Sequence, residues 1–187
     1  MINLNPALLL PKSSHYKFKR RDLMPSGKSL LWQIEVGVVR TLTWDEEGAM
    51  VTLGLWGAGD IVGQPLTQIN PYQIECHTAV ESHILPTGCW DSHQAMLSHI
   101  QKTEELLRII HCRQVECRLL QFLKWLACRF GREVAQGQLL DLRLTHQEIA
   151  QDIGTTRVTV TRLLNRLKQE KKIIWSAQRC ILLKGCN

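Results

Sequence analysis

The sequence predicts an α+β fold in which short antiparallel strands precede a long helix, and further helices and two short apolar runs complete the chain. Three patterns support this prediction. Residues 30–85 alternate short apolar runs with turn residues, which is typical of an antiparallel barrel or sandwich. Residues 92–113 have apolar residues at heptad spacing. Residues 145–172 show helical periodicity on both sides of a glycine.

The length and composition are those of a globular protein. The chain has 187 residues, of which 44% are hydrophobic, and this is enough for one or two domains with a core. No apolar run approaches the roughly 18 residues of a membrane span, and Ala7–Leu10 is too short for a secretory signal. We therefore expect a cytoplasmic protein that does not bind a membrane.

The net charge of +6 is unevenly distributed. Residues 1–91 carry seven Lys and Arg against nine Asp and Glu, residues 92–130 carry six against three, and residues 131–187 carry ten against five. A basic C-terminal part beside a slightly acidic N-terminal part indicates that the C-terminal part binds nucleic acid.

Cysteine and histidine spacing does not indicate a metal site. The seven cysteines lack C-x2-C spacing and the seven histidines lack H-E-x-x-H spacing, so we expect no metal and no cofactor. Cytoplasmic thiols should be reduced, and a redox role for an exposed thiol is left open. The sequence has no P-loop, no G-x-S-x-G motif and no paired-carboxylate signature, so we do not expect an enzyme.

The N-terminal region is expected to consist of short strands. Apolar and β-branched residues predict strands in Leu31–Thr43, interrupted at Gly37, in Met50–Trp56 and in Ile74–Val80. The basic segment Tyr16–Arg21 is expected to be a solvated surface strand or arm.

The long helix predicts a division into three parts, residues 1–91, 92–113 and 114–187. One face of this helix has positions spaced alternately four and three residues apart, which is the seam of a coiled coil. The seam residues are Met96, Ile100, Thr103, Leu107 and Ile110. The alternative is that the seam packs against the chain's own strands, but other apolar residues of the helix can make that contact. The seam therefore predicts a homodimer.

Apolar spacing predicts a second helix in residues 114–130, ending near Phe130 and Gly131. Residues 131–144 are expected to be a connector that contains turn residues and some strand character in Leu139–Leu144.

Two short helices are then predicted around Gly154. Thr145 and Glu148 have the spacing of a capping box, which begins a helix. Gly154 permits the positive φ that ends a helix, and Thr156 or Thr155 can cap the next one. The buried face of that next helix is predicted to consist of Val160, Leu163, Leu164 and Leu167.

The exposed face of the last helix has side chains suited to DNA. Arg157, Val158, Thr161 and Arg162 share one surface in its N-terminal half, where a helix in the major groove contacts bases. Forked guanidinium groups match guanine, while Val158 and the methyl group of Thr161 match the thymine methyl group. Contacts to the DNA backbone are expected from Thr145, Gln147, Thr156, Thr159, Arg166 and Lys168.

Two alternatives to DNA binding remain. The segment can be an ordinary helical hairpin with a solvated basic face, or the basic C-terminal part can belong to an interaction or adaptor protein that binds protein or RNA. A protein-docking helix more often presents large apolar anchors than arginines on its exposed face.

The run RVTVTRLL at Arg157–Leu164 resembles the recognition helix of the Crp/Fnr family of bacterial transcription regulators, and within it the cyanobacterial nitrogen regulators most closely. Ile173–Trp175 and Cys180–Leu183, around the polar turn Ser176–Arg179, are two apolar runs where that family has its β-hairpin wing. The resemblance implies a homodimer on a palindromic GTA…TAC-like double-stranded DNA site. It also implies RNA polymerase as a partner of any activator, although no local motif marks that contact.

The strand-rich region is similar to the family's cyclic-nucleotide-binding β-roll, with a G-D-x-x-G motif that ends at Gly63. Gln64 stands where cyclic-AMP-binding members have glutamate, and Gln73 and Ile74 stand where they have an Arg-Ser pair. The sequence has no Arg or Lys between Arg40 and Lys102, and a bound phosphate usually needs a cation. We therefore expect no cyclic AMP in the effector pocket that Gly63, Gln64, Gln73 and Ile74 would form, and the effector is unknown.

Overall fold

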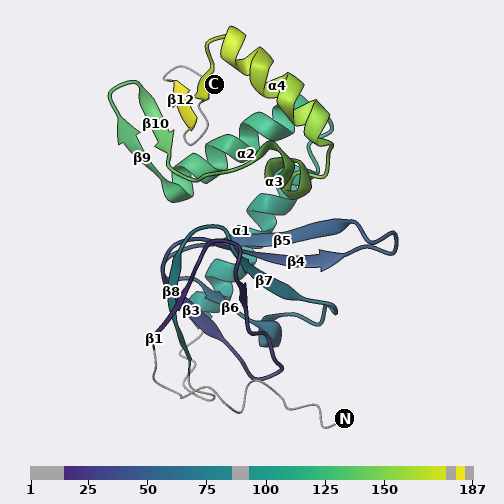
Figure 1. Cartoon of the computed structure of the whole chain (residues 1–187), viewed down its shortest axis with the longest axis vertical. Helices are drawn as coiled ribbons and strands as arrows, with labels where there is room; N and C mark the ends of the chain where they lie inside the picture. Colours follow the sequence, from purple (N-terminus) through teal and green to yellow (C-terminus); the bar gives the residue numbers. More distant parts are fainter. Residues whose placement is uncertain (1–14, 86–92, 176–179, 184–187) are drawn as a thin grey trace. The chain divides into compact units, whose positions relative to one another are not determined.

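The computed structural model describes residues 15–85, 93–175 and 180–183. The chain divides into two compact units, residues 1–104 and 105–187, and the division falls within helix α1 (His93–Ile110). Most of the regular secondary structure described in the first unit is strand, and most of that described in the second is helix, which confirms the α+β prediction (Figure 1). Among the described helices, none is long and apolar enough to cross a membrane.

The first unit contains two four-stranded antiparallel sheets. One sheet has the order β1 (His15–Phe18), β8 (Val80–Ile84), β3 (Trp32–Val36) and β6 (Ile61–Val62). The other has the order β2 (Leu23–Met24), β7 (Gln73–Cys76), β4 (Val39–Trp44) and β5 (Met50–Trp56). A short 3-10 helix, η2 (Gln64–Leu66), follows β6.

Both sheets contribute side chains to one hydrophobic core. Trp32 and Ile34 of β3 and Ile74 of β7 are completely buried in it. The indole of Trp32 packs edge-on against the rings of Tyr16 and Phe18, at centroid distances of 5.2 and 5.6 Å. The lysine between these two aromatic residues is exposed. The basic segment therefore begins as a surface strand, as predicted.

The predicted single strand Ile74–Val80 is wrong. The structure divides it between β7, which ends at Cys76, and β8, which begins at Val80 and belongs to the other sheet. The chain turns between the two strands because both backbone groups of Val38, the carbonyl and the N–H, form hydrogen bonds with residues of this segment. The Val38 carbonyl accepts hydrogen bonds from the N–H groups of His77 and Thr78, and the Val38 N–H donates to the Thr78 hydroxyl at 2.8 Å.

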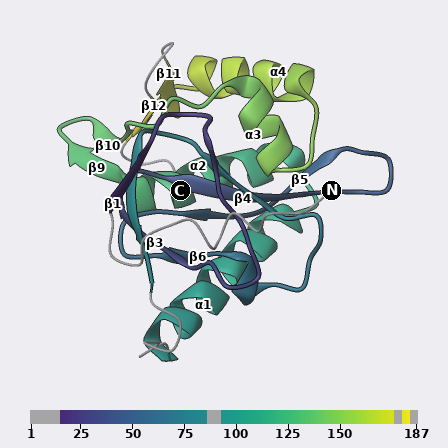
Figure 2. The ribbon, with the colours of Figure 1, turned by 60° about the horizontal axis from the view of Figure 1, so that its bottom comes forward.

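The second unit combines three helices with a four-stranded antiparallel sheet. The helices are α2 (Val115–Phe130), α3 (His146–Asp152) and α4 (Arg157–Gln169). The strands, in sheet order, are β11 (Ile173–Trp175), β12 (Cys180–Leu183), β10 (Gly137–Leu140) and β9 (Gly131–Val134). Helix α2 contacts β9, β10 and β12, while α3 and α4 lie side by side (Figures 1 and 2).

The two strands predicted for the wing are confirmed with the expected bounds, since β11 and β12 pair antiparallel. Their connecting turn, Ser176–Arg179, lies outside the described residues.

The prediction for residues 131–144 is partly wrong. Residues 131–140 form a hairpin of β9 and β10 rather than a connector, and the strand ends at Leu140. The hairpin partner explains this end, because Leu140 pairs with Gly131, which is the first residue of β9 and directly follows α2. Leu142 and Leu144 are buried without joining the sheet.

Candidate DNA-binding surface

Helix α3 begins at the predicted capping box. The Glu148 N–H donates to the Thr145 hydroxyl at 3.1 Å, and the Thr145 N–H donates to the Glu148 carboxylate at 2.7 Å. Glu148 is buried, so this carboxylate is held in place. The reciprocal bonds satisfy two N–H groups at the start of the helix and fix the direction in which α3 leaves the chain.

The turn between α3 and α4 also follows the sequence pattern. Gly154 has a φ of +63°, a left-handed conformation that favours glycine. Thr156 caps α4, because its hydroxyl accepts a hydrogen bond from the Thr159 N–H at 3.2 Å. The two threonine hydroxyl groups also lie 2.9 Å apart.

Helix α4 is amphipathic as predicted. Its buried stripe consists of Val160, Leu163, Leu164 and Leu167. Arg157 and Arg162 are exposed on the other side, and 78% of Val158 is accessible to solvent. Charged, forked side chains and one small apolar side chain are therefore presented together on the N-terminal half of the helix.

Thr161, the fourth predicted base-contacting residue, is half-buried and held from inside the fold. Its hydroxyl donates to the Arg157 carbonyl at 2.9 Å, so the His146 Nδ1 that lies 2.8 Å away must donate to it. Burial, followed by the charge of Arg157, lowers the pKa of His146. The His146 ring lies 5.8 Å from that of Trp175 on β11. The hydroxyl is thus engaged within the protein.

Arg118 of α2 holds the turn that precedes α4, and the sequence analysis did not identify it. Its Nη1 donates to the Ile153 carbonyl at 2.8 Å and to the Gly154 carbonyl at 3.3 Å. Its Nε and Nη2 donate to the Cys112 carbonyl at 3.2 and 3.0 Å. The bonds to Ile153 and Gly154 join residues 35 and 36 positions apart, so sequence spacing offers no signal for them.

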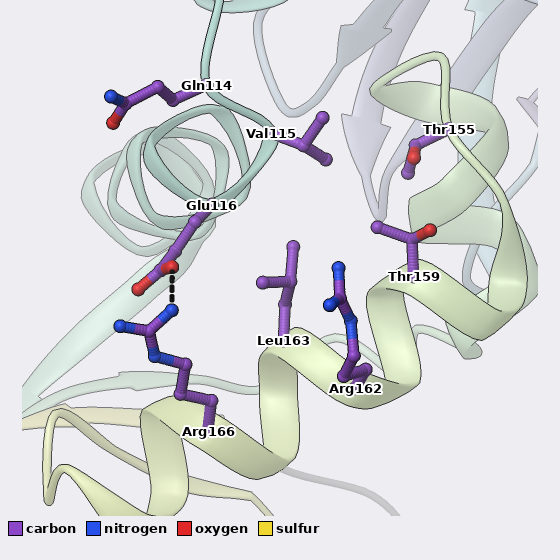
Figure 3. Close-up of a pocket in the computed structure, with 8 residues that line it drawn as sticks. All are labelled: Gln114, Val115, Glu116, Thr155, Thr159, Arg162, Leu163 and Arg166. Carbon is purple, nitrogen blue, oxygen red and sulfur yellow. Dashed lines mark hydrogen bonds and ion pairs between the residues drawn. The ribbon is translucent and has the colours of Figure 1, made fainter.

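An open hollow lies between the start of α2 and the N-terminal half of α4 (Figure 3). Arg162, Thr159 and Leu163 line its α4 side, and Arg166 reaches across to Glu116 on α2, with Nη1 2.9 Å from a carboxylate oxygen (Figure 3). Arg166 also donates through Nε to Glu170 at 2.8 Å. Arg166, which was expected to contact the DNA backbone, is thus paired with the carboxylates of Glu116 and Glu170.

The other residues expected at the DNA backbone have two kinds of environment. Thr145, Thr156 and Thr159 take part in the caps described above. Gln147 and Lys168 are exposed.

The seam predicted on α1 is largely accessible. Met96, Ile100 and Leu107 are 43%, 52% and 53% exposed, Thr103 is also exposed, and Ile110 is half-buried. These exposed fractions are high for apolar residues on one helix.

The predicted effector residues are engaged in the fold of the first unit. The Gln64 side-chain amide donates to the Ile69 carbonyl at 3.0 Å. Gly63, which precedes η2, has a φ of +155°, and a Cβ there would lie 2.2 Å from the Leu30 carbonyl oxygen. Ile74 is completely buried in the core, and Gln73 beside it is half-buried.

The cations that border this region are paired. Arg40 is 3% exposed, and its Nη2 lies 2.8 Å from a Glu75 carboxylate oxygen. Lys102 forms an ion pair with Asp60. Groups of histidine, cysteine, aspartate or glutamate that could hold a metal ion are absent from the described residues.

Comparisons with known proteins agree with this geometry. A model of the Crp-like helix-turn-helix domain matches residues 117–184. The regulatory protein CysR of Synechococcus elongatus is 45% identical over 157 residues, which cover 82% of this chain and 76% of that protein. The global nitrogen regulator of a Nostoc species is 44% identical over 80 residues, which cover 43% of this chain but only 36% of the relative.

The fold also matches solved structures. A transcriptional regulator of the CRP family from Thermus thermophilus has a TM-score of 0.76 at 22% identity, with 90% of this chain and 92% of that one covered. Its sequence identity is low, so this likeness bears on the fold. Because CysR, a regulatory protein, matches this chain along most of its length, and because the Crp-like helix-turn-helix model matches residues 117–184, the chain belongs to the Crp/Fnr family of DNA-binding transcription regulators.

Proposed function

We propose that the chain acts as a homodimer on a palindromic, GTA…TAC-like DNA site and does so without cyclic AMP. The observation that carries this proposal is the exposed face of α4, where Arg157 and Arg162 accompany Val158. Valine cannot accept a hydrogen bond from cytosine but suits a thymine methyl group. The 44% identity to a nitrogen regulator over 80 residues supports the same class of site.

Dimerisation is proposed from the exposed stripe of α1. Isolated apolar residues are common on protein surfaces, but a stripe at heptad spacing suits a second helix. In this proposal, residues 1–91 form the sensor-like domain, 92–113 the dimerisation helix and 114–187 the DNA-binding domain. Two such chains would place two recognition helices about one helical turn of DNA apart. The dimer would act in the cytoplasm, where an activating form would also contact RNA polymerase.

Side-chain contacts in the first unit support the proposal that DNA binding does not require cyclic AMP. Gln64 is hydrogen-bonded within its own loop, Ile74 belongs to the core, and Arg40 is paired with Glu75. A cyclic phosphate would need a cation, and recruiting Arg40 would break its ion pair with the half-buried Glu75 carboxylate, which is costly.

The test is fluorescence anisotropy of the purified chain with a GTA…TAC duplex, a TGTGA-containing duplex and a scrambled duplex, with and without cyclic AMP, over a salt series. We expect the palindrome to be preferred over the scrambled duplex by about 10³-fold or more, with no effect of the nucleotide. Weak, equal binding that disappears with salt would contradict the proposal, because it would be the electrostatic contribution alone.

Val158→Glu is the sharpest companion variant. Glutamate accepts from cytosine N4, so this variant should move preference from the GTA…TAC duplex toward the TGTGA-containing duplex. Val158 is mostly exposed, so the fold should tolerate the change. Gln147→Glu, which adds the same charge at an exposed position on α3, is the matched control and should weaken binding to both duplexes alike.

A further inference from the structure

Two cysteines flank the connection between α1 and α2. Cys112 follows the end of α1 by two residues, and Cys117 lies in the first turn of α2. Their thiols are hydrogen-bonded to each other. Gln121 on the next turn of α2 donates through Nε2 to the Cys117 sulfur at 3.2 Å. Both residues are partly accessible, so a small reagent can reach them.

The surroundings give the two sulfur atoms different roles. The Cys117 contact and burial raise the pKa of the Cys112 thiol, although the Gln114 N–H and the Arg118 charge act in the opposite direction. Cys112 thus keeps its proton and shares it with Cys117, whose sulfur also receives the Gln121 amide. The Cys117 sulfur is therefore in contact with both the second thiol and an amide donor.

Two other cysteines show what an inert thiol looks like in this chain. Burial raises the pKa of Cys76 and of Cys180 to about 12, and both side chains are inaccessible. The pair at the α1–α2 connection differs from them in exposure and in having a second sulfur in contact.

We propose that Cys112 and Cys117 are a redox site, which forms a reversible intramolecular disulfide with a hydroperoxide as oxidant. The Cys117 thiol gives up its proton and its sulfur attacks the peroxide oxygen, so that the sulfur becomes a sulfenic acid, the O–O bond breaks and the leaving oxygen takes up the proton as water or an alcohol. The Cys112 thiol then attacks the Cys117 sulfur, water leaves, and each sulfur has lost one electron overall. A dithiol reductant reverses the bond by exchange.

The same bond is coupled to the DNA-binding surface through Arg118. A disulfide requires a sulfur separation of about 2.05 Å, so Cys112 must approach the first turn of α2. Its carbonyl is the acceptor of two bonds from Arg118, whose remaining nitrogen holds Ile153 and Gly154 before α4. Displacement of that carbonyl should loosen the turn. This second step rests on the proposed function, whereas the disulfide does not.

The chemistry is tested by mass spectrometry of the full chain. Arg108, Arg113 and Arg118 divide the pair between two tryptic peptides, IIHCR and QVECR. After treatment of the protein with hydrogen peroxide, a non-reducing digest should contain the two peptides joined by a disulfide. The mass of the pair should be the sum of the two peptide masses less two hydrogens, and dithiothreitol should separate them. Cys112→Ser and Cys117→Ser should each abolish the link, while Cys128→Ser, which changes an exposed cysteine of α2, should leave it intact.

The coupling is tested by hydrogen exchange and DNA binding on reduced and oxidised protein. We expect faster amide exchange at residues 153–156 and about tenfold weaker binding to the palindrome after oxidation, which is the loss expected for hydrogen bonds of this kind. Cys117→Ser treated with peroxide should show neither change.

The outcomes separate the proposals. Linkage of other cysteines, or dimers joined by disulfides, would overturn the redox site. A correct link without faster exchange at residues 153–156 would overturn the coupling alone. If the reduced protein shows no preference for the palindromic duplex, the proposed function is contradicted. The disulfide-linked peptides can still be detected by mass spectrometry in that case.

Discussion

Arg157 and Val158 reach solvent from the first turn of α4, whereas Thr161 one turn later is bound by His146. The exposure of the first two follows from amphipathic spacing and could be predicted from the sequence. The bonds to Thr161 could not, because His146 lies 15 positions away and belongs to a different helix. Arg118 was missed for the same reason, since only the folded turn places its acceptors within reach.

Replacing Arg157 with alanine should cost about 1–3 kcal/mol of specific binding and should relax the preference at one base pair. Anisotropy against duplexes that each carry one substituted pair measures this effect. Lys168→Ala is the control, and because it removes a backbone charge it should weaken all duplexes equally and reduce the salt slope by about one. A uniform loss for Arg157→Ala would assign this residue to the backbone too.

His146 should make stability depend on pH. Its pKa is lowered from the ordinary 6.5, so between the folded value and 6.5 the unfolded chain binds more protons. Stability is therefore full above about pH 6.5 and falls as the pH drops towards the folded pKa.

Thermal unfolding between pH 8 and pH 5 checks this expectation. His146→Gln keeps a donor for Thr161 but does not titrate, so its loss of stability at low pH should be smaller than that of the wild type. His99 in the first unit has a lowered pKa as well, so some dependence should remain in the variant. Identical pH profiles for the two proteins would exclude a contribution from His146.

At the level of elements, patterns with strong local signals predicted the structure well. The bounds of β5, β11 and β12 and the caps of α3 and α4 match the expectation, because periodicity and capping are encoded within a few residues. The hairpin of residues 131–140 was missed because its strands are short and their pairing depends on β12, about 40 residues later.

The close approach of β10 to β12 predicts that Gly137 cannot be substituted without a loss of stability. A Cβ on Gly137, whose φ is +153°, would lie 1.9 Å from the Leu182 carbonyl oxygen. Gly137→Ala should therefore destabilise the protein by about 1–3 kcal/mol, measured as a lower urea midpoint. Gly48→Ala is the comparison, because Gly48 also has a positive φ but a Cβ there meets no atom within 4 Å. Equal losses would show that backbone strain, rather than the clash with β12, dominates.

For the whole molecule, the accessible stripe on α1 is the feature with the largest consequence. Ile100→Asp should convert the proposed dimer to monomers, because a charge would be buried at the centre of the seam. Sedimentation velocity measures the change, and affinity for the palindrome should fall with it. Gln101→Asp places the same charge on an exposed neighbour and should remain dimeric. If both variants sediment alike, α1 is not the interface.

Val158 also bears on how this regulator can change over evolutionary time. Since 78% of its surface faces solvent, the residue contributes little to the packing of α4. Substitutions there should alter which base pair is preferred while leaving the folding equilibrium nearly unchanged. Gene duplicates could therefore diverge toward separate sets of promoters through single codon changes at this position, without first acquiring stabilising mutations elsewhere.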